Sequence, residues 1–289
     1  MDSREIRHKI LLILEMVKFE HTIFALPFAF MGAFLAADGV PSLRQVFWIL
    51  VAMVGARNSA MAFNRIVDAE IDAKNPRTAN RAIPTGMIKK SEAWIFIVAS
   101  ALLFFLAAFM LNRLAFILSF PTMALILLYS YTKRLTSLSH LILGFADALA
   151  PIGGWIAIRG DLTWPPIVLG LGVTFWIGGF DILYSCLDYE FDQKEGLFSI
   201  PRVFGMVWGL RISTLFHILA ALFFFLTGIL AHLGSIYLVG CLLTSIFLIY
   251  EHLLVKPNDL SKMNLAFFTL NGYVSVILSV TMIADILRG

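Results

Sequence analysis

Long apolar stretches recur along the whole chain and alternate with short polar segments. Each stretch has about 20 mainly apolar residues, the length a helix needs to cross a hydrocarbon layer of roughly 30 Å at about 1.5 Å per residue. Runs such as 93–111 and 212–230 are apolar around the whole helical circumference, which is typical of helices that face lipid. The pattern predicts an all-α fold without strands, with nine spans at Phe19–Ala37, Val46–Val67, Ala93–Leu111, Leu114–Tyr131, Leu138–Ile158, Pro165–Leu187, Leu210–Leu230, Ser235–Val255 and Leu265–Leu287.

The composition indicates a polytopic membrane protein. Of the 289 residues, 60% are hydrophobic and 14% are charged, which is far more apolar than a soluble domain of this length. The longest polar stretch, Asp68–Glu92, is only a loop's length, so residues 1–289 are interpreted as a single integral membrane domain. Cys186 and Cys241 lie inside predicted spans without metal-ligand spacing and are expected to be buried thiols.

Lys and Arg are divided unevenly between the two sides of the predicted bundle. If the N-terminus is cytoplasmic, 17 of the 22 basic residues fall on the cytoplasmic side, as the positive-inside rule requires. Arg44, Arg113, Arg159 and Arg288 fall outside, and Arg57 lies within a span. This predicts a multi-pass protein of a bacterial-type inner (cytoplasmic) membrane. Basic loops beside a bilayer serve topology and contact anionic lipid, so nucleic acid is not an expected partner.

A polar residue occupies every fourth position at the end of the second predicted span. Asn64, Asp68 and Asp72 rotate by only about 40° per step on a helix, so they are expected to form one polar stripe at the cytoplasmic face. A second stripe closes the sixth span, where Asp188 and Asp192 are four residues apart and Asp181 precedes them by nearly two turns. The two stripes are predicted to lie at the same face.

Carboxylates beside a bilayer are costly unless they face a cavity and have a cationic partner. Hard oxygen ligands of this kind suit Mg²⁺, which binds one or two carboxylates and takes further oxygens from substrate phosphates. The stripes therefore predict a magnesium–diphosphate site, with Asn64 as a neutral oxygen ligand. The alternative for either stripe alone is simple solvation of a helix end, and it is less favoured for two stripes of equal spacing on one face.

Basic residues follow both stripes. Lys74, Arg77 and Arg81 lie in a loop with Pro76, Pro84 and Gly86, which favour a turn over the site. Arg offers a planar fork that fits phosphate oxygens.

Three further charged residues are candidates. Lys133 and Arg134 at the end of the fourth span either close the site or anchor a helix. Asp147, deep in the fifth span, is a cavity-lining candidate for which Arg57 could be an ion partner. The histidines have no ligand spacing and are interpreted as interfacial or core residues.

Together these residues resemble the UbiA superfamily of membrane prenyltransferases. The resemblance is carried by Asn64-x₃-Asp68-x₃-Asp72, by Asn75-Pro-Arg-Thr-x₂-Arg81-x₂-Pro-Thr-Gly86, by Asp181-x₂-Tyr184-x₃-Asp188-x₃-Asp192 and by Tyr131-Thr-Lys-Arg134. It covers essentially the whole chain and implies nine helices around a central cavity, with a lateral opening for a long prenyl tail. It also implies the following roles: Mg²⁺ binding by Asn64, Asp68, Asp72, Asp188 and Asp192; neutralisation of the diphosphate by Arg77, Arg81 and Lys133; and a position near the reacting carbon for Asp181 and Tyr184.

The reaction implied is transfer of a polyprenyl group from polyprenyl diphosphate to an aromatic acid. Ionisation of the allylic C–O bond gives an allyl cation, which an electron-rich ring attacks through carbon in a water-poor pocket before losing a proton. Within the superfamily the chain most resembles 4-hydroxybenzoate polyprenyltransferases of ubiquinone biosynthesis, and Arg134 is the hypothetical reader of the acceptor carboxylate. Phe24–Phe28 and Asp147–Pro151 also suit relatives that prenylate a naphthoate in an alternative menaquinone route.

A non-enzymatic alternative is a cation-coupled transporter that uses its intramembrane carboxylates. Transporter sites usually lie near the midplane of the bilayer on broken helices. Both carboxylate stripes here are predicted at one membrane edge and are followed by basic loops, so the sequence favours the enzyme.

Overall fold

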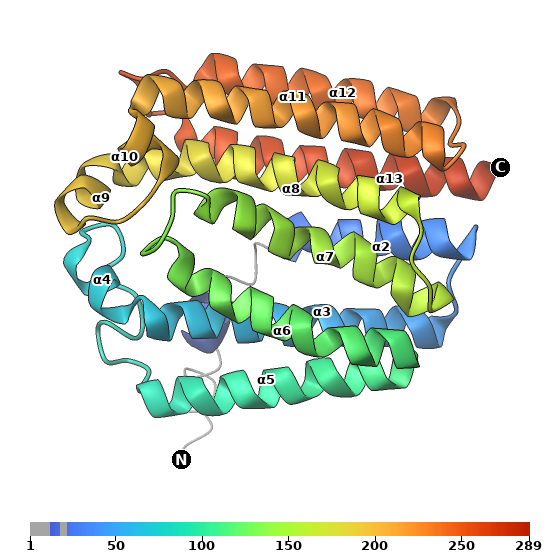
Figure 1. Ribbon diagram of the computed structural model, residues 1–289, viewed down its shortest axis with the longest axis horizontal. Helices are drawn as coiled ribbons and strands as arrows, with labels where there is room; N and C mark the ends of the chain where they lie inside the picture. The colour runs from blue at the N-terminus through green and yellow to red at the C-terminus, as the bar shows by residue number, and fades with distance from the viewer. Residues whose placement is uncertain (1–11, 18–21) are drawn as a thin grey trace.

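The computed structural model describes residues 12–17 and 22–289, and within them the only extended pairing is one isolated β-bridge. The long helices run side by side, and the short helices α4, α9 and α10 gather at one end of the bundle (Figure 1). The helices are α2 (Thr22–Ala37), α3 (Leu43–Val67), α4 (Ala69–Lys74), α5 (Lys90–Leu111), α6 (Arg113–Thr132), α7 (Ser139–Arg159), α8 (Trp164–Ser185), η2 (Cys186–Asp188), α9 (Tyr189–Glu195), α10 (Ile200–Phe204), α11 (Met206–Leu230), α12 (Ser235–Leu254), η3 (Leu265–Leu270) and α13 (Asn271–Arg288).

Eight helical segments of the described chain are long and apolar enough to cross a membrane. They correspond in order to the second to ninth predicted spans, with η3 and α13 forming one continuous segment. The first predicted span corresponds to the shorter apolar helix α2, and residues 19–21 of that span lie outside the described residues. The prediction of an all-helical polytopic membrane fold is confirmed.

The two segments that carry the carboxylate stripes are not regular helices. The chain leaves α3 at Asp68, whose φ of −88° and ψ of −1° separate α3 from α4. At the second stripe, a 3₁₀ turn at Cys186–Asp188 separates α8 from α9. Each break changes the direction in which later side chains point, because the four-residue spacing keeps residues on one face only while the helix is continuous.

Helix α7 is packed against α2 and α8 through glycines. A Cβ on Gly144 would lie 2.1 Å from the carbonyl oxygen of Thr174 on α8, and a Cβ on Gly154 would lie 2.1 Å from that of Ala29 on α2. Only a residue without a side chain permits such close contact between backbones, as is common in membrane helix pairs.

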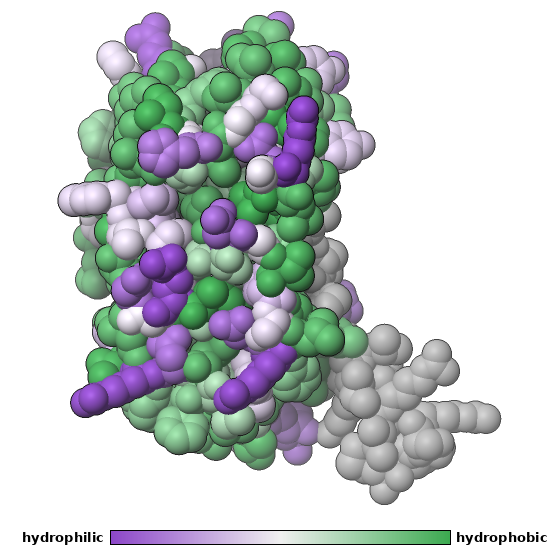
Figure 2. Space-filling view, turned by 90° about the vertical axis from the view of Figure 1, so that its right-hand side faces the viewer, coloured by the Kyte–Doolittle hydropathy of each residue, from purple (hydrophilic) through white to green (hydrophobic). Residues whose placement is uncertain are grey.

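The outward faces of the helices are apolar. On α5, for example, Ile95, Val98, Leu102 and Phe109 are all exposed, which is expected of a helix in lipid. Figure 2 shows the end of the bundle opposite α4, α9 and α10, where hydrophilic side chains are scattered among hydrophobic ones. The four basic residues predicted to lie outside occupy helix ends in α3, α6, α7 and α13 on that side.

Candidate active site

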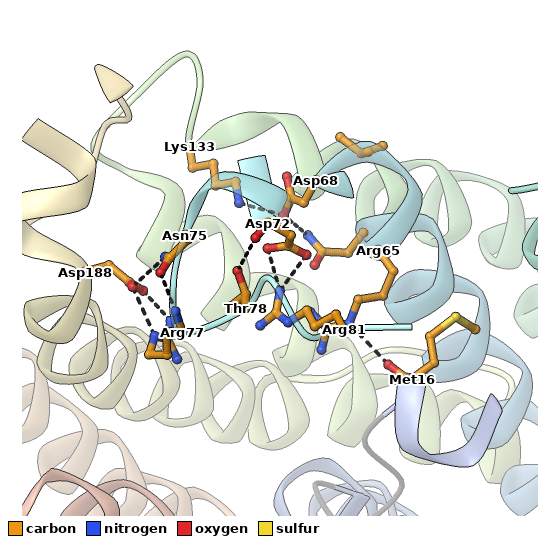
Figure 3. A network of polar contacts seen from close by, with 12 residues as sticks. Met16, Arg65, Asp68, Asp72, Asn75, Arg77, Thr78, Arg81, Lys133 and Asp188 are labelled. Carbon is orange, nitrogen blue, oxygen red and sulfur yellow. Dashed lines mark hydrogen bonds and ion pairs between the residues drawn. The ribbon is translucent and has the colours of Figure 1, made fainter. Parts of the chain in front are cut away.

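Asp68 is a buried carboxylate held by two cations that follow the end of α6. Lys133 Nζ lies 2.6 Å from its Oδ2, and Arg134 Nη2 lies 2.9 Å from its Oδ1. Asn64, one turn earlier on α3, donates its side-chain amide to Asp68 Oδ2 at 3.1 Å. The end of α6 thus closes onto the first stripe, as Figure 3 shows for Lys133 and Asp68.

Asp72 is also buried, and Arg81 is its partner. Arg81 Nη1 lies 2.7 Å from Asp72 Oδ1 and 2.8 Å from Oδ2. The loop between these residues is fixed by the Thr78 hydroxyl, which donates to the Asp72 carbonyl at 3.1 Å. The turn predicted over the site is therefore present and folds back onto the first stripe.

The same loop reaches the second stripe at Asp188. The Asn75 amide donates to Asp188 Oδ1 at 2.9 Å, and Arg77 Nε donates to it at 3.0 Å. Arg77 Nη2 pairs with Asp188 Oδ2, and Nη1 donates to the Tyr184 hydroxyl at 2.8 Å. Burial by itself would lower the pKa of Arg77, but the hydrogen bond and charge of Asp188 outweigh it and raise that pKa, so the guanidinium stays charged.

The remaining acids of the second stripe have different partners. Asp192 is buried and accepts the Ser199 hydroxyl at 2.7 Å. Asp181 lies 2.7 Å from His140 Nδ1, while the Ile200 amide donates to His140 Nε2 at 3.2 Å. Because Nε2 accepts this bond, the proton of a neutral imidazole is on Nδ1 and is donated to Asp181.

The prediction that a stripe points in one direction is therefore wrong in detail, for the first stripe as well as the second. The chain breaks at Asp68, and Asp68 and Asp72 pair with different cations. It breaks again at the 3₁₀ turn Cys186–Asp188, and the acids of the second stripe also have separate partners. The two stripes nevertheless meet at one end of the bundle. The loop 75–81 contacts both, and the Phe198 amide donates to the Lys133 carbonyl at 2.7 Å.

A cavity of about 1430 Å³ extends from this polar end into the bundle. Its polar end is lined by Asn64, Arg77, Arg81, Asp181 and Tyr184, and its deeper part is mostly apolar. Arg57 and Asp147 line it between these regions, as predicted for Asp147. The cavity therefore has a charged mouth and an apolar interior.

A sequence model of the UbiA prenyltransferase family matches residues 25–273. The chain belongs to that family. Family membership makes it a membrane prenyltransferase and sets the transporter alternative aside.

Individual relatives agree with this membership. A 4-hydroxybenzoate octaprenyltransferase of Aliivibrio fischeri (strain MJ11) is 29% identical over 254 residues, which cover 88% of each protein. The apo structure of a UbiA homolog from Aeropyrum pernix K1 is 35% identical, with a TM-score of 0.84 over 92% of this chain and 98% of that one. A UbiA homolog from Archaeoglobus fulgidus bound to GPP and Mg²⁺ is 21% identical, with a TM-score of 0.74 over 96% and 100% of the two chains, and shares the fold.

Several residues of this UbiA-family site were missed by the sequence reasoning. The sequence pattern gives Asn75 a place in the loop motif but no role, indicates an interfacial or core position for His140, and does not single out Ser199. Their partners lie between 7 and 113 positions away in the chain. The Asn-Pro pair at 75–76 was the one available signal, because a short polar residue before proline often terminates a helix with its side chain.

Proposed function

We propose that this enzyme transfers a polyprenyl group from polyprenyl diphosphate to an aromatic acid, with 4-hydroxybenzoate as the acceptor. Carbon ortho to the phenol would be alkylated, in ubiquinone biosynthesis. The observation that carries the proposal is the Arg77 loop, which joins two carboxylate clusters above a cavity with an apolar interior. The curated relatives named as 4-hydroxybenzoate octaprenyltransferases support the acceptor.

The residues proposed to hold Mg²⁺ are Asn64, Asp68, Asp72, Asp188 and Asp192. No group of three His, Cys, Asp or Glu side chains converges on one point in the described part of the chain. The donors are nevertheless carboxylate and amide oxygens, the ligands that Mg²⁺ accepts when phosphate oxygens complete its shell, so the chemistry of the residues fits the ion. When bound, the ion neutralises negative charge on the phosphate oxygens.

The basic partners of these acids are suited to the diphosphate itself. Arg77, Arg81 and Lys133 each donate to a carboxylate of the site. In a metal-bound diphosphate, the metal ion would pair with the carboxylates and the phosphate oxygens would accept from Arg77, Arg81 and Lys133. Each carboxylate and each basic side chain could thus exchange its present partner for a new one, and no buried charge would be left unpaired.

The proposed reaction breaks the allylic C–O bond, and its electron pair leaves with the diphosphate. Arg77 and Lys133 stabilise the charge that develops on the departing oxygen. Tyr184 lies beside Arg77 at the mouth of the cavity, and Phe267 stacks on it with ring centroids 4.1 Å apart, so aromatic faces border the place where the allyl cation forms. The apolar cavity keeps water from quenching that cation.

The acceptor ring then forms the C–C bond and loses one proton. Asp181 is the proposed proton acceptor, because it lines the cavity one turn from Tyr184 and His140 fixes its orientation. Asp147 is proposed to bind the acceptor from deeper in the cavity.

Two basic residues compete for the acceptor carboxylate. Arg134 donates to Asp68 and to the carbonyl oxygens of Ser130 and Val67, and it is not among the cavity-lining residues described. Arg57 does line the cavity, seven residues and about 10 Å along α3 from Asn64. This geometry favours Arg57 over Arg134 for the role.

The active end is proposed to face the cytoplasm, with the N-terminus on the same side. The uneven distribution of Lys and Arg supports this orientation, since the opposite end has only four of the 22 basic residues. The membrane would then be a bacterial-type inner membrane.

The decisive experiment incubates the purified protein and Mg²⁺ with a polyprenyl diphosphate and either 4-hydroxybenzoate or a dihydroxynaphthoate, and identifies products by mass. A prenylated hydroxybenzoate with one equivalent of diphosphate is expected. If a product forms only from the naphthoate, the enzyme belongs instead to the alternative menaquinone route. Arg57→Ala should raise the KM for the acceptor about tenfold, with Arg134→Ala as its comparison.

A further inference from the structure

The cavity continues far beyond the polar groups. From His140, which contacts Asp181 at the mouth, to Gly153 is thirteen residues along α7, or about 20 Å. Gly153 lines the same cavity, together with Leu111 and Leu162 near the opposite end of the bundle. An elongated apolar substrate entering from the diphosphate site would therefore pass along α7.

Gly153 differs from the other glycines on α7. A Cβ on Gly144 or Gly154 would collide with the backbone of a neighbouring helix, whereas a Cβ on Gly153 would meet no atom within 4 Å. Glycine in a helix interior is less favourable than alanine, so it needs a reason at each position. Close helix packing supplies that reason for Gly144 and Gly154 but not for Gly153. The absence of a side chain at position 153 widens the cavity, whereas at positions 144 and 154 it lets a neighbouring helix approach closely.

We propose that Gly153 determines the length of prenyl chain that the enzyme accepts, by leaving open the deep part of the cavity. The inference rests on the proposed prenyl transfer and extends it to a substrate class, namely polyprenyl diphosphates of more than four isoprene units.

The limit of four units follows from chain geometry. An extended peptide residue has three in-line bonds and spans 3.3–3.6 Å, which is about 1.2 Å per bond. An isoprene unit has four in-line bonds and spans roughly 5 Å on the same basis, so about four units cover the distance from the mouth to Gly153. A geranyl group, with two units, ends well before Gly153, whereas an octaprenyl group that follows α7 extends beyond it.

A larger side chain at position 153 should therefore lower kcat/KM for long prenyl diphosphates and leave kcat/KM for short ones unchanged. Leucine at this position would project into the open space and obstruct the passage, without touching the diphosphate site about 20 Å away. Gly153→Ala adds only a methyl group and is the control for the change in backbone freedom. Ala284→Leu, at an exposed position on α13 that lines neither cavity described, is the control for adding a large apolar side chain to the bundle surface.

The experiment measures kcat/KM of the full chain with geranyl diphosphate and with octaprenyl diphosphate, using 4-hydroxybenzoate and Mg²⁺. Gly153→Leu is expected to reduce kcat/KM for the octaprenyl substrate by about tenfold or more and to leave the geranyl value within about twofold. Gly153→Ala and Ala284→Leu should leave the ratio between the two substrates unchanged. Retained geranyl activity also reports that the variant is folded.

Two results would overturn the inference. If Gly153→Leu leaves kcat/KM unchanged for both substrates, the tail does not pass this residue. If it lowers kcat/KM equally for both, the substitution acts on the site as a whole. Failure of the unsubstituted protein to prenylate an aromatic acid from either diphosphate is a different result. It would refute the proposed function and this inference with it.

Discussion

Arg77 and Asp188 join the two halves of the active site: they are 111 residues apart in the chain, yet Arg77 Nε donates to Asp188 Oδ1 at 3.0 Å and Nη2 pairs with the second oxygen. The same guanidinium donates to the Tyr184 hydroxyl. One planar side chain thus fixes a proposed metal ligand and an aromatic ring at the cavity mouth. This fork cannot be reproduced by an ammonium group.

Arg77→Lys is therefore expected to reduce kcat by about 10²-fold or more, although the positive charge is retained. The measurement is steady-state kinetics with saturating acceptor. Lys74→Ala is the matched control in the same loop, because Lys74 forms an exposed ion pair with Glu195 at 2.7 Å and such pairs contribute little. Comparable losses in the two variants would contradict the role assigned to the fork.

Asp68→Asn tests the buried ion pair at the end of α6. The substitution removes one charge and leaves Lys133 and Arg134 without their carboxylate partner, which costs about 3 kcal/mol of stability for a buried pair. Activity should be lost and the thermal unfolding midpoint in detergent should fall. The double variant Asp68→Asn with Lys133→Met should recover part of the stability and none of the activity; full stability of the single variant would argue against a tightly coupled pair.

His140→Phe tests the positioning of Asp181. The imidazole donates from Nδ1 to Asp181 and accepts from the Ile200 amide, so its removal frees the carboxylate to rotate. We expect kcat to fall about tenfold while the KM for prenyl diphosphate is little changed, because His140 contacts no residue proposed to bind the phosphates. Asp181→Asn should show a larger loss of kcat. A rise in the KM for prenyl diphosphate without a change in kcat would contradict this assignment.

Asn271→Leu tests a buried network behind the cavity wall. Asn271 accepts the Trp176 indole N–H at 2.6 Å and donates to Glu251 at 2.9 Å and to the Ala266 carbonyl at 3.1 Å. Loss of the amide leaves buried polar groups without partners, and we expect stability to fall by about 2 kcal/mol or more.

Ala266 lies in the π-helical turn η3, which also presents Phe267 to Tyr184. The Asn271 variant should therefore lower kcat as well as the unfolding midpoint, measured on the same preparation. Thr244→Ala, at a buried polar residue of α12 that contacts neither Asn271 nor η3 through a hydrogen bond, is the control and should leave kcat unchanged. An Asn271 variant of full stability and activity would exclude a supporting role for the network.

Much of the fold follows from the sequence because lipid imposes simple requirements. The length and apolarity of each span come from the bilayer, and an internally hydrogen-bonded helix is the simplest structure that satisfies them. The four-residue spacing of Asn64, Asp68 and Asp72 likewise places the first stripe at a helix end.

The pairing of side chains does not follow from the sequence in the same way. Arg134 was interpreted as a reader of the acceptor because of its motif, but its direction depends on how α6 approaches α3. The spacing of the second stripe predicts one helix face, because no residue in it indicates the 3₁₀ turn at Cys186–Asp188. His140 acquires its role only through the contact between α7 and α8, which sequence periodicity does not encode.

The glycine contacts on α7 have a consequence for how this enzyme can adapt to different substrates. Backbone contact at Gly144 and Gly154 fixes one wall of the cavity against α2 and α8, with no side chains between them that could repack. Helices α3 and α5 are fixed to one another in the same way, because a Cβ on Gly55 would lie 2.7 Å from the carbonyl oxygen of Ser100. A bulkier guest must then be admitted through the side chains that line the cavity, since the backbones that carry them cannot separate easily. Variation among enzymes of this design should accordingly concentrate on cavity-lining side chains, position 153 included, while the helix backbones that meet at these glycines keep their spacing.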